Sequence, residues 1–321
     1  MPRRNIQKVF LAREQPEGAG ATVRRSIGTP QLRHLTPFLM LDHFSIPPSA
    51  GFPDHPHRGQ ETITYLLAGG VEHEDIKGNR GRLNPGDLQF MTAGRGIVHA
   101  EMPALDSPET VGMQLWVDLP RDLKMCAPRY RDLRAEEIPR ATAADGSVEV
   151  KVISGRSLGV ESLKDLAYTP VWLLDIIVRP GGHIEQELPR NWNAFAYLLD
   201  GTAKFSNGSD MSEPVQAFHN VVFKQSTDKS QNEGAGNSDK NDKSDSDTVL
   251  IEVPSSSPTP ARIIFVAGIP LDQPVVQHGP FVMTSRDEIM DTMVDYQTGS
   301  NGFERAHDWR SEIGERMGRV H

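Results

Sequence analysis

The sequence has few cysteines, few aromatic residues and no long hydrophobic run. One cysteine, Cys126, stands among 321 residues, so no disulfide can form within the chain. A large chain without disulfides suits a reducing compartment, and we expect it in the nucleus and cytoplasm. No segment approaches the ~20 apolar residues that a membrane-spanning helix needs, and the N-terminal residues lack the apolar run of a signal peptide. We therefore expect no membrane partner.

The sequence also lacks an excess of positive charge: 34 Lys and Arg stand against 43 Asp and Glu, and the formal net charge is −9 at pH 7. Nonspecific binding to nucleic acids depends on clustered Lys and Arg side chains that neutralise phosphates. The sequence therefore predicts no direct binding to nucleic acid. Any role in the nucleus is expected to depend on protein partners.

Glycine and proline are plentiful, with 28 and 24 residues, and their distribution indicates short strands joined by turns. Turn sequences such as Asn-Pro-Gly-Asp at 84–87 and Asp-Gly at 145–146 separate apolar segments. The expected strands are 61–67, 87–92, 113–118, 149–153, 171–178, 194–199, 220–223, 249–253 and 263–267. One helix is expected at 285–297, with Ser285 as N-cap. This pattern predicts an all-β fold of antiparallel barrels or sandwiches with a C-terminal helix.

The chain length favours two domains of roughly 150 residues each. The pattern Tyr-Leu-Leu-x-Gly occurs at 65–69 and again at 197–201, which indicates a duplicated barrel. We predict an N-terminal barrel at 1–130, a C-terminal barrel at 131–280 and a helical tail at 281–321. Within the second barrel, the segment 225–247 contains no large apolar residue, so we expect it to be a disordered insert.

Four metal-ligand side chains occur in two pairs with the same spacing. His55 and His57 are two residues apart, as are His99 and Glu101. Residues two apart on a strand point to the same face, so two such strands would bring three imidazoles and one carboxylate to one barrel mouth. Glu61 remains an alternative ligand or a residue that supports one. The remaining histidines are interpreted as structural.

The ligand types also restrict the metal. Structural zinc sites often use cysteine, and Cys126 lies outside the motif. Three nitrogen ligands and one oxygen ligand, with two positions left open, match six-coordinate iron, manganese, nickel or copper. We expect one iron ion (Fe2+ or Fe3+) per chain. Gln114 either lines the same pocket or faces solvent.

These motifs resemble those of the cupin superfamily, which has Gly, His-x-His, Glu and Gly in its first motif and Gly-x-x-His in its second. Within that superfamily, the chain is similar to the pirin family. The similar segments are HPHRG at 55–59, NPGD at 84–87, TAGRG at 92–96 and HAEMP at 99–103, with PFLMLD at 37–42 and QHGPFVM at 277–283. The resemblance covers nearly the whole chain except the polar insert and the last residues.

The resemblance implies a bicupin, that is, two cupin-type barrels, with an iron centre in the N-terminal barrel. Its implied ligands are His55, His57, His99 and Glu101. In this family Glu61 is not expected to bind the metal. The repeat spacing places Glu187, Pro189 and Asn193 opposite His55, His57 and Glu61, which implies that the second barrel has no metal site.

The resemblance also implies two functions. The first is a quercetin 2,3-dioxygenase activity, which opens the ring of a flavonol with dioxygen, with Glu101 as the catalytic group that takes the substrate proton. The apolar residues Phe52, Phe90, Met91 and Val98 could form the pocket walls, although core packing is the more common role at such positions. The alternative is a non-enzymatic, redox-sensing nuclear cofactor of transcription whose partners are transcription-factor proteins. A storage or structural cupin is a third interpretation.

Overall fold

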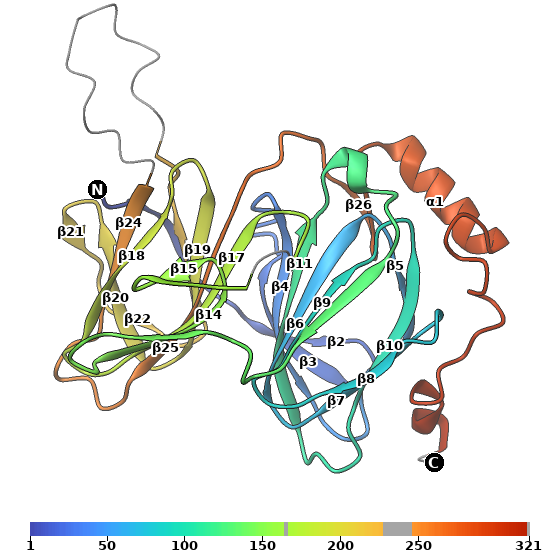
Figure 1. Ribbon diagram of the computed structural model, residues 1–321, viewed down its shortest axis with the longest axis horizontal. Helices are drawn as coiled ribbons and strands as arrows, with labels where there is room; N and C mark the ends of the chain where they lie inside the picture. The colour runs from blue at the N-terminus through green and yellow to red at the C-terminus, as the bar shows by residue number, and fades with distance from the viewer. Residues whose placement is uncertain (164–165, 227–245, 320–321) are drawn as a thin grey trace, which may run out of the picture. The chain divides into compact units, whose positions relative to one another are not determined.

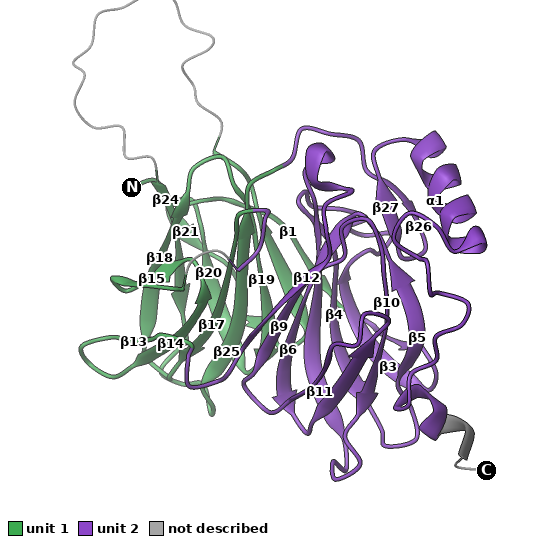
Figure 2. Cartoon of the chain, turned by 45° about the vertical axis from the view of Figure 1, so that its right-hand side comes forward, with its two compact units in different colours: residues 1–12, 138–164, 170–270 green, residues 13–137, 165–169, 271–321 purple. Residues whose placement is uncertain are grey.

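The computed structural model describes residues 1–163, 166–226 and 246–319, and the chain divides into two compact units (Figures 1 and 2). Unit 1 contains residues 1–12, 138–164 and 170–270, and unit 2 contains residues 13–137, 165–169 and 271–321. Each unit has one seven-stranded sheet, one smaller sheet of four or five strands and a separate two-stranded sheet, all antiparallel. The expected all-β fold with a C-terminal helix is confirmed.

The two units differ in their bounds from the predicted domains 1–130, 131–280 and 281–321. Residues 1–12 belong to unit 1, because strand β1 (Ile6–Leu11) pairs with β23 (His219–Phe223) at the edge of its large sheet. Residues 271–321 belong to unit 2, because helix α1 (Arg286–Thr298) packs on a hydrophobic cluster of that unit through Ile289. The helical tail is therefore part of the unit that carries the histidine motif.

Unit 1 encloses an apolar core. Its large sheet has the order β1-β23-β19-β25-β17-β14-β13, and its smaller sheet has the order β18-β24-β20-β21, with β22 beside β20. The strands not yet given are β13 (Arg140–Thr142), β14 (Val148–Ser154), β17 (Val171–Val178), β18 (His183–Pro189), β19 (Asn193–Asp200), β20 (Thr202–Asn207), β21 (Asp210–Met211), β22 (Val215–Gln216), β24 (Ser246–Glu252) and β25 (Ala261–Gly268), and the hairpin β15 (Arg156–Ser157) and β16 (Val160–Glu161).

Unit 2 has the same layout. Its large sheet has the order β12-β9-β6-β11-β4-β3-β2, and its four-stranded sheet has the order β5-β10-β7-β8. The strands are β2 (Glu14–Glu17), β3 (Ala21–Ile27), β4 (Phe38–Ile46), β5 (Phe52–His57), β6 (Gln60–Ala68), β7 (Val71–Asp75), β8 (Arg80–Leu83), β9 (Leu88–Thr92), β10 (Ile97–Pro103), β11 (Thr110–Asp118), β12 (Arg129–Leu133), β26 (Val276–His278) and β27 (Phe281–Met283). Two short 3-10 helices are Arg121–Leu123 and Gly314–Arg319.

The local signals in the sequence explain much of this structure. All nine predicted strands are present, and β17 has the predicted bounds. Helix α1 begins after Ser285, whose hydroxyl accepts a hydrogen bond from the backbone N–H of Glu288 while the Glu288 carboxylate accepts one from the backbone N–H of Ser285. This capping box satisfies N–H groups that have no partner inside the helix. Within the described residues, no helix is both long enough and apolar enough to cross a membrane.

The predicted insert 225–247 needs one correction. Residues 227–245 lie outside the described residues, but Ser246 and Asp247 belong to strand β24. The Asp247 side chain is fully buried and lies 3.1 Å from Nε of Arg4, which is also buried. Asp247 was assigned to the insert because its neighbours are polar. Its burial is possible because the Arg4 guanidinium compensates its charge.

Candidate metal centre

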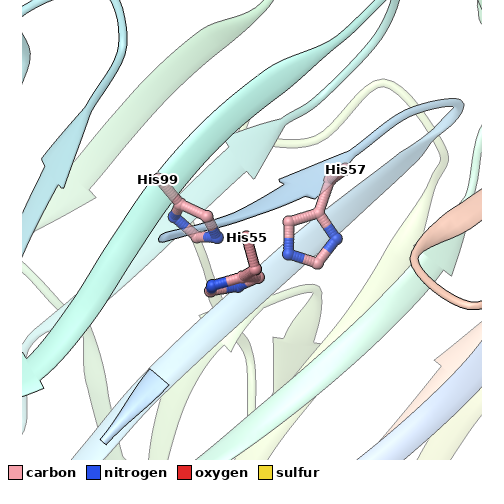
Figure 3. A group of neighbouring side chains, drawn as sticks. All are labelled: His55, His57 and His99. Atoms are coloured by element: carbon pink, nitrogen blue, oxygen red, sulfur yellow. The ribbon is translucent and has the colours of Figure 1, made fainter. Parts of the chain in front are cut away.

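The four-stranded sheet of unit 2 carries the predicted ligands on two neighbouring strands. His55 and His57 lie on β5, and His99 and Glu101 lie on β10. His55 and His99 are direct cross-strand partners, so their side chains share one face of the sheet. The register of β5 and β10 shifts between His99 and Glu101. Figure 3 shows the three imidazole rings converging on one point.

The three histidines are close enough to bind one ion. Their ligand nitrogens all lie within 4.8 Å of one another. The ring centroids are 4.9 Å apart for His55 and His57, 4.4 Å for His55 and His99, and 5.0 Å for His57 and His99. Among the His, Cys, Asp and Glu side chains of the described residues, these three histidines form the group whose geometry could hold a metal ion.

The hydrogen bonds around the rings fit a metal. Nδ1 of His55 lies 2.8 Å from the carbonyl oxygen of Pro53, so Nδ1 carries the proton and donates it, leaving the Nε2 lone pair free. Nε2 of His57 and Nε2 of His99 are buried without a hydrogen-bond partner among the residues that the structure describes. Such unpaired buried nitrogens are costly unless they bind something. The residues present therefore fit a metal ion.

The electrostatics also favour neutral imidazoles, the form that binds metals. Burial lowers the pKa of His55 and lowers the pKa values of His57 and His99 well below their usual range. The His55 ring also disfavours a proton on His57 and His99, and the His57 ring disfavours one on His99. At neutral pH the three lone pairs are available without a proton having to leave first.

Glu101 lines the same cavity as His55 and His57, but it is not part of the three-histidine cluster. Its Oε1 is 3.2 Å from Oγ1 of Thr64, and burial raises the pKa of Glu101 to about 7. Burial and the Thr64 hydrogen bond are the influences on Glu101, and neither of them brings a positive charge to its carboxylate. A bound cation would supply the missing positive charge, which makes Glu101 the natural candidate for the fourth ligand.

Glu61 has a different set of partners. Its carboxylate accepts hydrogen bonds from Oγ1 of Thr92 at 2.7 Å and from the backbone N–H groups of Tyr168 and Thr169 at 3.0 to 3.1 Å. Burial raises its pKa, and these hydrogen bonds oppose the increase. Glu61 therefore fastens the segment around Tyr168 and Thr169 to the large sheet, a role that the sequence interpretation did not include.

Several residues around the histidines were missed by the sequence interpretation. Nε2 of Gln60 lies 2.8 Å from Nδ1 of His57, and the Trp116 ring meets the His57 ring edge-on with centroids 5.1 Å apart. Arg58, next to His57, is buried and donates a hydrogen bond to the carbonyl oxygen of Arg95. The one available signal was that Arg58 directly follows the His-x-His motif and that Gln60 comes two residues later.

A cavity of about 650 Å³ opens beside the histidines. Gln114 lines it, which decides between the two predicted positions for this residue, and Phe52 lines it as expected. The other predicted wall residues lie elsewhere: Met91 and Val98 pack in the hydrophobic cluster under α1, and Phe90 is buried outside the cavity lining. Val98 adjoins His99 on one strand, so its side chain points to the opposite face.

The correspondence predicted for the second barrel is also corrected. On β18 the buried residues are Ile184, Gln186 and Leu188, so Glu187 and Pro189 lie on the other face of that strand. They do not occupy the inward positions that His55 and His57 occupy. The interior of unit 1 is filled by apolar side chains, among them Ile184 and Leu188.

Comparisons with known proteins agree with this architecture. The family model Pirin matches residues 20–117, and the model Pirin C-terminal cupin domain matches residues 242–302. The human protein named Pirin is 44% identical over 305 residues, which cover 95% of this chain and 96% of the human chain. The two barrels are therefore cupin domains.

Two solved structures share the fold at low sequence identity. A quercetin 2,3-dioxygenase from Acinetobacter baumannii has a TM-score of 0.77 at 23% identity and covers 92% of this chain and 98% of its own. A bacterial pirin from Escherichia coli, solved in complex with nickel(II), has a TM-score of 0.58 at 17% identity and covers 82% of this chain and 100% of its own. These two likenesses concern the fold alone, whereas the 44% identity to human pirin over nearly the full length shows that the chain belongs to the pirin family.

Proposed function

We propose that this protein is an iron-dependent dioxygenase of the quercetin 2,3-dioxygenase type, which acts on flavonols or similar aromatic molecules. One observation carries the proposal: the Nε2 atoms of His57 and His99 are buried without hydrogen-bond partners among the described residues, and His55 and His57 of the same histidine cluster line a cavity of about 650 Å³. A cavity of this size accommodates a drug-sized aromatic ligand.

The proposed metal site consists of His55, His57, His99 and Glu101. Three nitrogens and one carboxylate oxygen leave two positions open on a six-coordinate iron. When bound, the ion supplies Lewis acidity toward a deprotonated substrate hydroxyl and a position for dioxygen. Nickel and manganese fit the same ligand types, and metal analysis of protein purified without added metal distinguishes them.

The residues of the chain have separate roles in this proposal. Glu101 is the proposed catalytic base: its carboxylate lies in the cavity beside the proposed metal position, within reach of a substrate hydroxyl that binds there. The side chains of Phe44, Phe52 and Trp116 line the cavity and provide apolar surface for aromatic rings. Together they would hold the substrate with its hydroxyl close to Glu101 and shield it from water.

Dioxygen consumption with a panel of flavonols tests the proposal. We expect the iron-loaded protein to consume dioxygen and release carbon monoxide, and the variant His99→Ala, treated in the same way, to do neither. Absence of turnover with every flavonol would contradict the enzymatic proposal. The remaining proposal would then be a redox-sensing nuclear cofactor that recognises a transcription factor in only one oxidation state of iron, which a pull-down with ferrous and ferric protein tests.

A further inference from the structure

A stripe of polar side chains crosses the wall of the cavity in unit 2. Arg25 on β3 is the cross-strand partner of Asp42 on β4, Asp42 is the partner of Gln114 on β11, and Gln114 is the partner of Thr64 on β6. Directly opposed residues share one face of a sheet, and all four line the cavity. Four neighbouring strands therefore each place one polar group on the same wall.

The stripe is bordered by apolar side chains. The bordering residues lie two positions along the strand from a member of the stripe, so they share its face. They are Val23 beside Arg25, Met40 and Phe44 beside Asp42, and Trp116 beside Gln114, and all four line the cavity. At one end, Thr64 Oγ1 lies 3.2 Å from Oε1 of Glu101. A flat aromatic ligand that lies on the apolar borders would therefore have its oxygen substituents along the stripe, with one end at the histidines.

The opposite end of the stripe is a charged triad, Glu17–Arg25–Asp42. Nε and Nη2 of Arg25 donate to the two carboxylate oxygens of Asp42 at 2.8 and 2.7 Å, and Nη2 also donates to Oε2 of Glu17 at 2.6 Å. This bidentate pairing fixes the guanidinium plane. Nη1 has no hydrogen-bond partner within the described ranges, so its N–H groups are left for a ligand.

The charge of the triad determines which ligand group it accepts. One guanidinium faces two carboxylates, and the Asp42 side chain is only 5% exposed. A ligand carboxylate here would meet two like charges, whereas a hydroxyl can accept from Nη1 and donate to a carboxylate oxygen. Two strand spacings, roughly 10 Å, separate Asp42 from Thr64. A flavonol with a hydroxyl on its outer ring has a comparable length.

We propose that the Glu17–Arg25–Asp42 triad recognises a neutral hydroxyl at the end of the ligand remote from the histidines, so that the cavity selects polyphenols and rejects aromatic carboxylates. This inference rests on the proposed function. Arg25 is then a specificity-determining residue, while the metal ligands act on the other end of the same molecule.

Binding measurements with three matched ligands test this specificity. Unsubstituted 3-hydroxyflavone and its 4′-hydroxy and 4′-carboxy derivatives are titrated anaerobically into the metal-loaded full chain, with fluorescence as the readout, so that no turnover is needed. We expect the 4′-hydroxyl to tighten binding about tenfold and the 4′-carboxylate to weaken it. In Arg25→Met/Asp42→Asn, the 4′-hydroxyl derivative should no longer bind more tightly than the unsubstituted ligand does in the same variant.

Two further variants complete the test. Glu17→Gln leaves the Arg25–Asp42 pair intact and removes one like charge, so we expect tighter binding of the carboxylate. Arg24→Met is the matched control, because Arg24 is the neighbour of Arg25 on β3 and its guanidinium binds Glu14. If the preference for the hydroxyl survives in Arg25→Met/Asp42→Asn, or if carboxylate binding is unchanged in Glu17→Gln, the proposed role of the triad is wrong. The proposed function of the metal site would not be affected by either result. Failure of 3-hydroxyflavone to bind the wild type would overturn the proposed function, and the triad with it.

Discussion

The side-chain amide of Gln60 lies 2.8 Å from Nδ1 of His57, on the side of the ring away from the metal-facing Nε2. A histidine that binds a metal through Nε2 carries its proton on Nδ1, which then needs an acceptor. Oε1 of Gln60 is buried without a partner among the described residues, and a half-turn of the amide would place it there. Gln60 can therefore hold the His57 ring in one orientation with or without metal.

Replacing Gln60 with Leu should lower metal affinity by about 10- to 100-fold, because His57 loses the group that orients it. Gln60→Glu keeps an acceptor and should retain more of the affinity. Metal titration in competition with a chelator measures both, and Gln31→Leu at an exposed position is the control. Equal affinity in Gln60→Leu and wild type would show that the hydrogen bond does not position the ring.

The raised pKa of Glu101 predicts a pH effect on the metal-free chain. Burial raises the pKa from 4.5 to about 7, so the folded state binds the proton more tightly than the unfolded state does. The stabilisation is fully present below pH 4.5 and is lost as the pH rises through 7. Relative to Glu101→Gln, the wild type should lose about 3 kcal/mol of unfolding free energy across this window.

Denaturant unfolding of the metal-free wild type and Glu101→Gln at pH 4.5 to 8 measures this difference. The variant cancels contributions from the histidines, which titrate in both proteins. A difference that is constant with pH would contradict a protonated Glu101 in the metal-free fold.

The sequence was sufficient to predict the ligand pairs, because the two-residue period of a strand is local information. It was not sufficient to predict which residues oppose each other. The pairing of His55 with His99 and the register shift before Glu101 depend on strands far apart in sequence. The stripe that links Arg25 to Thr64 has the same origin, since its four residues come from four strands.

The incorrect predictions also have physical causes. Val98 was a candidate for either the cavity wall or the core because it is apolar and adjoins His99, and it packs in the core because adjacent strand residues face opposite ways. Glu187 was matched to His55 from the repeat spacing, but a one-residue difference in register between two strands moves every side chain to the other face. Apolar character therefore indicated that a side chain is buried, while only the strand register indicated to which face of the sheet it points.

Asp247 provides a test of the corrected insert boundary. Its carboxylate and the Arg4 guanidinium form a buried pair in unit 1, and Arg190 lies 3.5 Å from its other oxygen. Asp247→Ala should cost about 3 to 5 kcal/mol of unfolding free energy, because Arg4 is left as an uncompensated buried charge. Ser246→Ala, one residue away at the start of β24, should cost far less. Thermal unfolding with similar midpoints for both variants would be inconsistent with a buried ion pair.

The ligand set can be tested by comparing its two glutamates. Glu101 lines the cavity, whereas the Glu61 carboxylate accepts backbone N–H groups of Tyr168 and Thr169. Glu101→Gln should therefore lose most of the metal affinity. Glu61→Gln should keep the metal and lower the melting temperature, since it weakens buried hydrogen bonds.

Iron titration of wild type, His55→Ala, Glu101→Gln and Glu61→Gln under identical conditions tests the metal centre most directly, with His43→Ala as a control on β4. We expect one ion per chain in the wild type, Glu61→Gln and His43→Ala, near-background binding in His55→Ala, and greatly weakened binding in Glu101→Gln. Full occupancy in His55→Ala, or loss of iron in Glu61→Gln with retention in Glu101→Gln, would contradict a centre formed by His55, His57, His99 and Glu101.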